Sequence, residues 1–153
     1  HSPFCIVPMS SPAERAAYEQ AHIRWAASDI EGFLELFTED VLYNVNVDGL
    51  AVPYASSALG KEDVRQRLQF LLHVFTVDRF EPEIIVDEGD HWRSLVIGHY
   101  THRRTGEQLH VRIRFRVWFR DGLISRMDEH HDAAYVEAFQ RFVFHLQNAA
   151  QGS

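Results

Sequence analysis

The sequence predicts an α+β fold, in which one curved antiparallel or mixed sheet wraps around N-terminal helices and a C-terminal helix comes last. Helical periodicity dominates the first half of the chain, strand-like segments fill residues 79–130, and residues 133–146 again have helical spacing. Helices followed by a run of neighbouring strands are typical of α+β domains. The 153 residues, 46% hydrophobic and 24% charged, suit a single globular domain.

Three helices are expected before the main run of strands. Ser11 can cap the first, Pro12 occupies its first turn, and Glu14 completes a capping box. Its apolar positions then recur every four residues as far as Trp25. Asp29 can cap a second, short helix, and residues 61–75 carry the apolar stripe of a third.

Five strands are expected, over residues 41–47, 79–87, 91–101, 107–120 and 123–130, with a loop at 48–60. The clearest is 107–120, where apolar residues from Val111 to Phe119 alternate with Arg112, Arg114, Arg116, Trp118 and Arg120. Asp121 and Gly122 indicate a type I′ hairpin turn between the last two strands.

The domain is expected to span residues 11–147. Residues 1–10 fit poorly with the helix signal at Ser11 and are interpreted as a leader or a disordered arm, because Met9 resembles a natural start. Residues 148–153 are polar and small, which predicts a frayed tail.

Charge and composition exclude several classes of partner. The net charge of −7 disfavours nucleic acid and anionic membranes, which are polyanions. Cys5 is the only cysteine, no apolar run approaches the roughly 20 residues of a membrane span, and no secretory signal is visible. A soluble, cytoplasmic protein is expected. No phosphate-binding glycine loop or nucleophile elbow is present, and no cofactor is expected.

Two sequence segments, residues 28–41 and 121–132, resemble the nuclear transport factor 2-like superfamily, particularly its SnoaL-like and ketosteroid isomerase-like members. The resemblance runs from about Pro12 to Phe142. It implies a cone-shaped sheet whose concave face meets the helices around a pocket open at one end, and it implies frequent homodimers. Because this fold serves many functions, the function has to be argued from the site.

Two enzyme templates of the superfamily match this chain differently. The aspartate base of ketosteroid isomerase-like enzymes falls on Val45, or on Asn46 after a one-residue slip, so that activity is not expected. In limonene epoxide hydrolase-like enzymes, the tyrosine and the last acid match Tyr43 and Glu129. The asparagine, arginine and aspartate of that mechanism fall on Val45, Tyr100 and His102.

The resemblance and the strand alternation together select the catalytic candidates. Glu129 would project into an apolar cavity, where desolvation disfavours a charged carboxylate and favours general acid–base use. His102 would exchange protons with Glu129, and Tyr43 and Tyr100 would donate hydrogen bonds to a developing oxyanion. A register slip by one residue would put His99 and Thr101 on the inner face instead.

The predicted ligand-binding residues surround these groups. They are His22, Trp25, Val45, Tyr54, Val111, Ile113, Phe115 and Met127. No metal is expected, because the adjacent His130 and His131 point to opposite faces of a strand. Of the ten histidines, only His22 and His102, with His99 as the register alternative, remain in the predicted site.

Two hypotheses for the function result. The first is an enzyme that binds a small, mostly apolar, cyclic metabolite and acts as a cyclase, isomerase, dehydratase or hydrolase; a scytalone dehydratase-like lyase would need His99 or His102 beside His22. The alternative is a ligand-binding or dimeric assembly module without catalysis. In either case a homodimer is expected through the convex face that carries Arg112, Arg114, Arg116 and Trp118.

Overall fold

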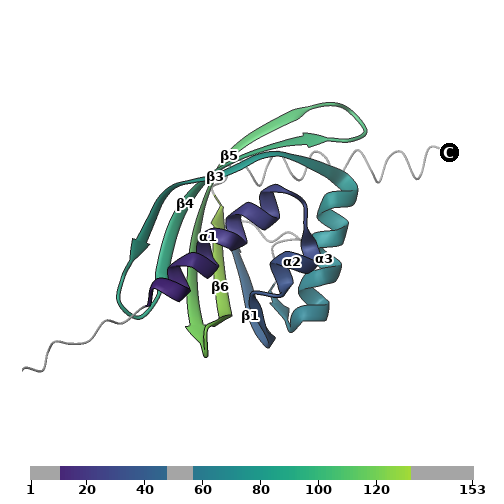
Figure 1. Cartoon of the computed structure of the whole chain (residues 1–153). Coiled ribbons are helices and arrows are strands. Elements are labelled where there is room, and N and C mark those ends of the chain that lie inside the picture. Colours follow the sequence, from purple (N-terminus) through teal and green to yellow (C-terminus); the bar gives the residue numbers. More distant parts are fainter. Residues whose placement is uncertain (1–10, 48–56, 132–153) are drawn as a thin grey trace, which may run out of the picture.

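A strongly curved sheet with helices in its hollow forms the described part of the chain (Figure 1). The computed structural model describes residues 11–47 and 57–131. The elements are α1 (Pro12–Ala26), α2 (Ile30–Leu34), β1 (Phe37–Val47), β2 (Ala58–Leu59), α3 (Lys61–Val74), β3 (Phe75–Asp87), β4 (Trp92–His102), β5 (Gln108–Arg120) and β6 (Leu123–His131). This confirms the predicted α+β class.

The helix and turn signals act as predicted. The Ser11 side chain accepts a hydrogen bond from the backbone N–H of Glu14, and Asp29 caps α2 by accepting one from Gly32. Asp121 and Gly122 both have positive φ, at 54° and 81°, as a type I′ turn requires. None of the helices in residues 11–47 and 57–131 is long and apolar enough to cross a membrane.

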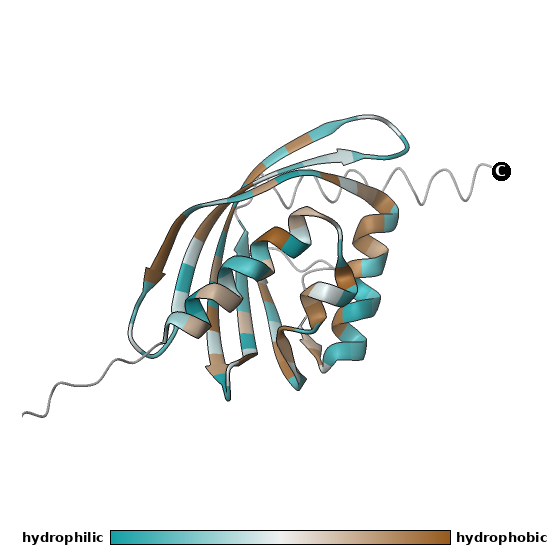
Figure 2. Cartoon of the chain, in the orientation of Figure 1, coloured by the Kyte–Doolittle hydropathy of each residue, from teal (hydrophilic) through white to brown (hydrophobic). Residues whose placement is uncertain are grey.

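The sheet has the order β2-β1-β6-β5-β4-β3. All neighbours pair antiparallel except β1 and β6, which are parallel, so the sheet is mixed. Hydrophobic and hydrophilic residues alternate along β5, in agreement with its burial pattern (Figure 2). The buried set faces α1, α2 and α3, while the arginines face the convex side.

Strand boundaries differ from the prediction in three places. β1 begins at Phe37, although Glu39 and Asp40 are residue types that strands disfavour, because Phe37 pairs with Ile124 of β6. β3 begins at Phe75, where a helix end was predicted, because it pairs with the end of β4. β2 lies inside the predicted loop and pairs with β1.

The register around Gly98 puts Tyr100 and His102 on the inner face, as predicted, and not the alternative pair His99 and Thr101. Tyr100 and His102 are buried, at 5% and 1% exposure, whereas His99 is half-buried and stacks on His110 across the convex side. The predicted C-terminal helix, the leader and Tyr54 lie outside the described residues.

Candidate functional site

The parallel pair β1 and β6 brings two polar side chains together on the concave face. Val45 pairs with Glu129, and Tyr43 pairs with Met127, one step earlier on the same face. Tyr43 is therefore the diagonal neighbour of Glu129, a separation that long side chains bridge. Both residues lie in the C-terminal halves of their strands. Because the strands are parallel, both side chains are at the same end of the sheet.

Both carboxylate oxygens of Glu129 are engaged. The Tyr43 hydroxyl donates to Oε1, and the Nε2 atom of His131 contacts Oε2. The Glu129 side chain retains 15% exposure, against 2% for His131. Glu129 is therefore the more accessible of the two, with His131 behind it. A carboxylate held in this way can accept or deliver a proton at an oxygen whose position is fixed.

A second phenol lies on the neighbouring part of the concave face. The Trp25 indole N–H donates to the Tyr100 hydroxyl over 3.3 Å. Burial raises the pKa of Tyr100 above its ordinary value, and the charge of Glu129 raises it further. Tyr100 consequently stays protonated and can act as a hydrogen-bond donor.

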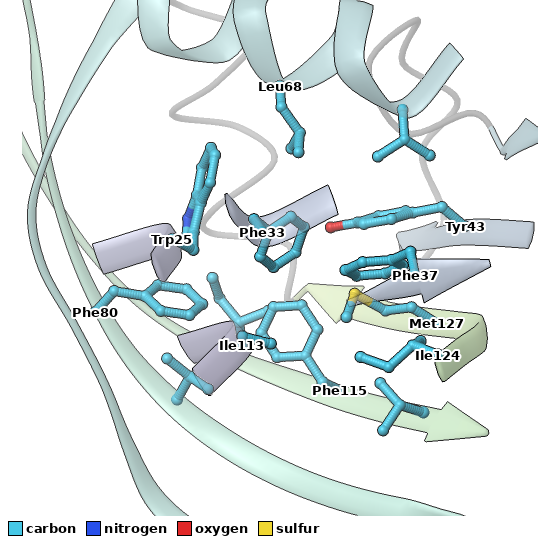
Figure 3. Close-up of a cluster of buried hydrophobic side chains, with 14 of the residues drawn as sticks. Trp25, Phe33, Phe37, Tyr43, Leu68, Phe80, Ile113, Phe115, Ile124 and Met127 are labelled. Carbon is cyan, nitrogen blue, oxygen red and sulfur yellow. The ribbon is translucent and has the colours of Figure 1, made fainter. Parts of the chain in front are cut away.

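An apolar wall surrounds these groups. Ile113, Phe115 and Met127 are 2%, 6% and 3% exposed, and Val111 and Trp25 are also buried. Val45 is half-buried against the same cluster. Figure 3 shows the Tyr43 ring entering this cluster with its hydroxyl directed toward Phe33. The predicted apolar lining residues that fall in the described part of the chain thus all contribute to one hydrophobic cluster.

His22 belongs to a separate buried network. Its Nδ1 lies 2.7 Å from the Tyr18 carbonyl oxygen, which can only accept, so Nδ1 donates. Its Nε2 then accepts from the Ser94 hydroxyl at 3.1 Å, and the Tyr18 hydroxyl lies 2.6 Å from the same Ser94 oxygen. Burial lowers the pKa of His22. A neutral imidazole with both nitrogens engaged therefore ties α1 to β4, close to Phe80 and Phe115.

His102 lies at the turn between β4 and β5. Its Nδ1 accepts from the backbone N–H of Thr105 at 3.2 Å and lies 2.9 Å from the Thr105 hydroxyl. Its ring packs edge-on against Phe75. The imidazole in contact with Glu129 is that of His131, and the exchange of protons between His102 and Glu129 stays a prediction.

The sequence analysis left His131 out of the site. The signal that identifies it was available, because Met127, Glu129 and His131 are two residues apart and share one face of β6. The rule that separated His130 from His131 thus also directs His131 inward. Within residues 11–47 and 57–131, no group of three or more His, Cys, Asp or Glu side chains is placed to hold a metal ion.

Comparisons with known proteins give a family from the sequence and a fold from solved structures. The sequence model of the SnoaL-like domain matches residues 16–127. Among curated proteins, none matches at a significant level. The solved structures described below are 17–20% identical to this chain, so they support the fold alone.

Three of these structures illustrate the likeness. An NTF2-like protein of unknown function from Burkholderia pseudomallei has 17% identity and a TM-score of 0.72, over 82% of this chain and 95% of that one. TerC, co-crystallised with polyporic acid, has 20% identity and a TM-score of 0.71, over 86% and 98%. A protein from Xanthomonas campestris, named provisionally as a polyketide cyclase, has 18% identity and a TM-score of 0.63, over 78% and 90%.

Proposed function

The chain belongs to the SnoaL-like domain family, and from that premise we propose that it binds a small, largely apolar, cyclic metabolite at the concave face and performs acid–base chemistry on it. The reaction is of the cyclase, isomerase, dehydratase or hydrolase type. Two neighbours of the fold, one named provisionally as a polyketide cyclase and one crystallised with polyporic acid, are consistent with a cyclic ligand.

The observation that carries this proposal is the hydrogen bond between Tyr43 and Glu129 on a concave face that is lined mainly by apolar side chains. Apolar binding sites with a few converging polar groups are typical of small-molecule sites. Glu129 is assigned as the proton carrier because it combines a carboxylate with partial exposure. Tyr100 is assigned as a donor to an oxygen of the ligand, since it is a phenol on the same face. The single O–H of Tyr43 is donated to Glu129, so Tyr43 would donate to the ligand once Glu129 has taken up a proton. Ile113, Phe115 and Met127 give the apolar contacts.

A fluorescent phenol tests this assignment without knowledge of the natural substrate. 2-Naphthol is a fused-ring, mostly apolar molecule that becomes a strong acid when excited, and its neutral and deprotonated forms emit at different wavelengths. Bound beside Glu129, it should transfer its proton to the carboxylate and emit as naphtholate. Glu129→Gln keeps the shape of the side chain but removes the acceptor, so the bound probe should emit as neutral naphthol.

The matched control is Asp128→Asn, because Asp128 is the adjacent carboxylate on the opposite face of β6 and pairs with Arg126. This variant should behave as the unaltered protein. Saturable binding with the same emission from the Glu129→Gln variant would remove Glu129 from the role of proton carrier. If 2-naphthol binds but transfers no proton in the unaltered protein or in Glu129→Gln, the second function is favoured, a binding module without catalysis.

The convex face supports the proposal of a homodimer. Arg112, Arg114 and Arg116 project from β5, Arg93 from β4, and Trp118 packs under Arg126 at 4.6 Å. On the other side of β4, the edge strand β3 carries Glu81 and Glu83, which pair within the chain with Arg79 and Arg112, and the exposed Ile84 lies beside them.

A two-fold axis along β4 would place the β5 arginines of one copy opposite the β3 glutamates of the other. Leu95 and Ile97, half-buried on the convex side of β4, would meet their own copies at that axis. Such self-complementary patches are what a two-fold interface requires.

A further inference from the structure

The His131 imidazole lies directly behind the proposed proton carrier, a place that the proposed function does not use. We propose that His131 is the positioning residue of the site: it holds Oε2 of Glu129 so that Oε1 stays directed at Tyr43 and at the ligand. This inference rests on the proposed function for its purpose, but the contact itself can be tested in the ligand-free protein.

The first step of the argument is burial. His131 is 2% exposed, whereas Glu129 keeps 15% of its side-chain exposure. A ligand at the concave face would therefore meet Glu129 before His131. The imidazole acts through the carboxylate and does not itself touch the ligand.

The second step is the direction of the hydrogen bond. An ionised carboxylate only accepts, so the Nε2 atom of His131 is the donor toward Oε2. Hydrogen bonds to a charged acceptor are about twice as strong as neutral ones. The pair therefore selects the His131 tautomer with a proton on Nε2.

The third step is geometry. The last torsion of a glutamate side chain is soft, and a carboxylate held at one oxygen alone rotates easily. Tyr43 holds Oε1 and His131 holds Oε2, from two neighbouring strands. The two donors together fix the plane of the carboxylate, which fixes the direction from which it takes a proton.

The experiment is nuclear magnetic resonance of the full ligand-free chain, labelled with nitrogen-15. Two signals are monitored: the nitrogen shifts of the His131 ring, which report its tautomer, and the downfield hydroxyl proton of Tyr43. The variants are His131→Leu, which cannot donate, and His131→Gln, whose amide can donate to Oε2. His91→Gln applies the same change to a histidine that also pairs with a carboxylate, Asp90, outside the proposed site.

Unaltered protein should show the Nε2-protonated tautomer of His131 and a protected hydroxyl proton of Tyr43. In His131→Leu, the carboxylate is free to turn away from Tyr43, so exchange of the Tyr43 hydroxyl proton with water should accelerate, by up to roughly the tenfold that corresponds to the lost hydrogen bond between His131 and Glu129. His131→Gln should restore most of the protection, and His91→Gln should leave it unchanged.

Several results would overturn the inference. They are a His131 ring protonated on Nδ1 alone in the unaltered protein, equal exchange in His131→Leu and the unaltered protein, or equal loss of protection in the Leu and Gln variants. The last result would mean that His131 contributes packing alone. If His131→Leu does not fold, the reciprocal Glu129→Gln variant decides, because its weaker acceptor should speed exchange of the His131 Nε2 proton, and unchanged exchange would refute the contact.

These outcomes are separate from those of the proposed function. The resonance signals need no ligand, so they can confirm the positioning contact even if 2-naphthol fails to bind. Conversely, proton transfer from bound 2-naphthol to Glu129, with no effect of His131→Leu on the Tyr43 proton, would uphold the proposed function and refute the role of His131.

Discussion

Replacing Ser94 by alanine should destabilise the fold far more than the loss of one hydroxyl suggests. Ser94 is 1% exposed and is the shared partner of the Tyr18 hydroxyl and the His22 Nε2 atom. Ser94→Ala leaves two buried polar groups without this partner. Each such group costs about 1–3 kcal/mol, so the free energy of unfolding should fall by about 4 kcal/mol.

Urea unfolding monitored by circular dichroism measures this loss. With a slope of about 2 kcal/mol per molar urea, the midpoint should fall by roughly 2 M while the slope stays constant. Tyr18→Phe is the milder comparison, because Ser94 can still donate to His22, and it should cost about 1 kcal/mol.

The double variant gives the sharper test. Tyr18→Phe in the Ser94→Ala background removes a phenol that has lost its partner, so the double variant should be more stable than Ser94→Ala alone. A Ser94→Ala loss below about 0.5 kcal/mol, or simple addition of the two single losses, would refute the buried network.

Three further predictions concern pH, packing and assembly. Burial lowers the pKa of His22 below its ordinary 6.5 in the folded protein, so as the pH falls the unfolded chain binds a proton first. The free energy of unfolding should therefore fall as the pH drops below about 6.5. His22→Gln should flatten this dependence, measured by urea titrations at several pH values. Gly98→Ala should displace Tyr100, because the added Cβ would lie 2.9 Å from the Tyr100 Cε2 atom, and should cost about 1–3 kcal/mol, again read from urea midpoints. Arg112→Glu should weaken the proposed dimer in sedimentation velocity and Glu81→Arg in the same chain should restore it, because both residues pair with Ile97 of β4 and lie at one level of the proposed axis; an unchanged oligomeric state in the single variant would remove this face from the interface.

Much of the fold could be predicted from local pattern. Alternation from Val111 to Val117 gave the correct inward face of β5, and Asp121–Gly122 gave the correct turn, because both signals lie within a few residues. The start of β1 at Phe37 could not be predicted in this way. Its pairing with Ile124 is a long-range contact, which outweighs the poor strand composition of the residues after Phe37.

In the candidate site, too, single residues could be placed from the sequence, whereas contacts between distant segments could not. The family resemblance placed Tyr43 and Glu129 on the concave side, but their hydrogen bond depends on the register of two parallel strands, which brings together residues 86 positions apart in sequence. Sequence spacing also gave no sign that Ser94 would face Tyr18 and His22, since that depends on how α1 docks on the sheet. The omission of His131 had a different cause, because strand alternation alone would have placed it beside Glu129.

The central claim, that Tyr43 and Glu129 receive a cyclic ligand at the concave face, is tested most directly by a crystal structure of the chain soaked with 2-naphthol. The account predicts density for the fused rings against Phe115 and Met127, with the naphthol oxygen within hydrogen-bond distance of Glu129. Side chains that fill this space, with the probe bound elsewhere or not at all, would contradict it.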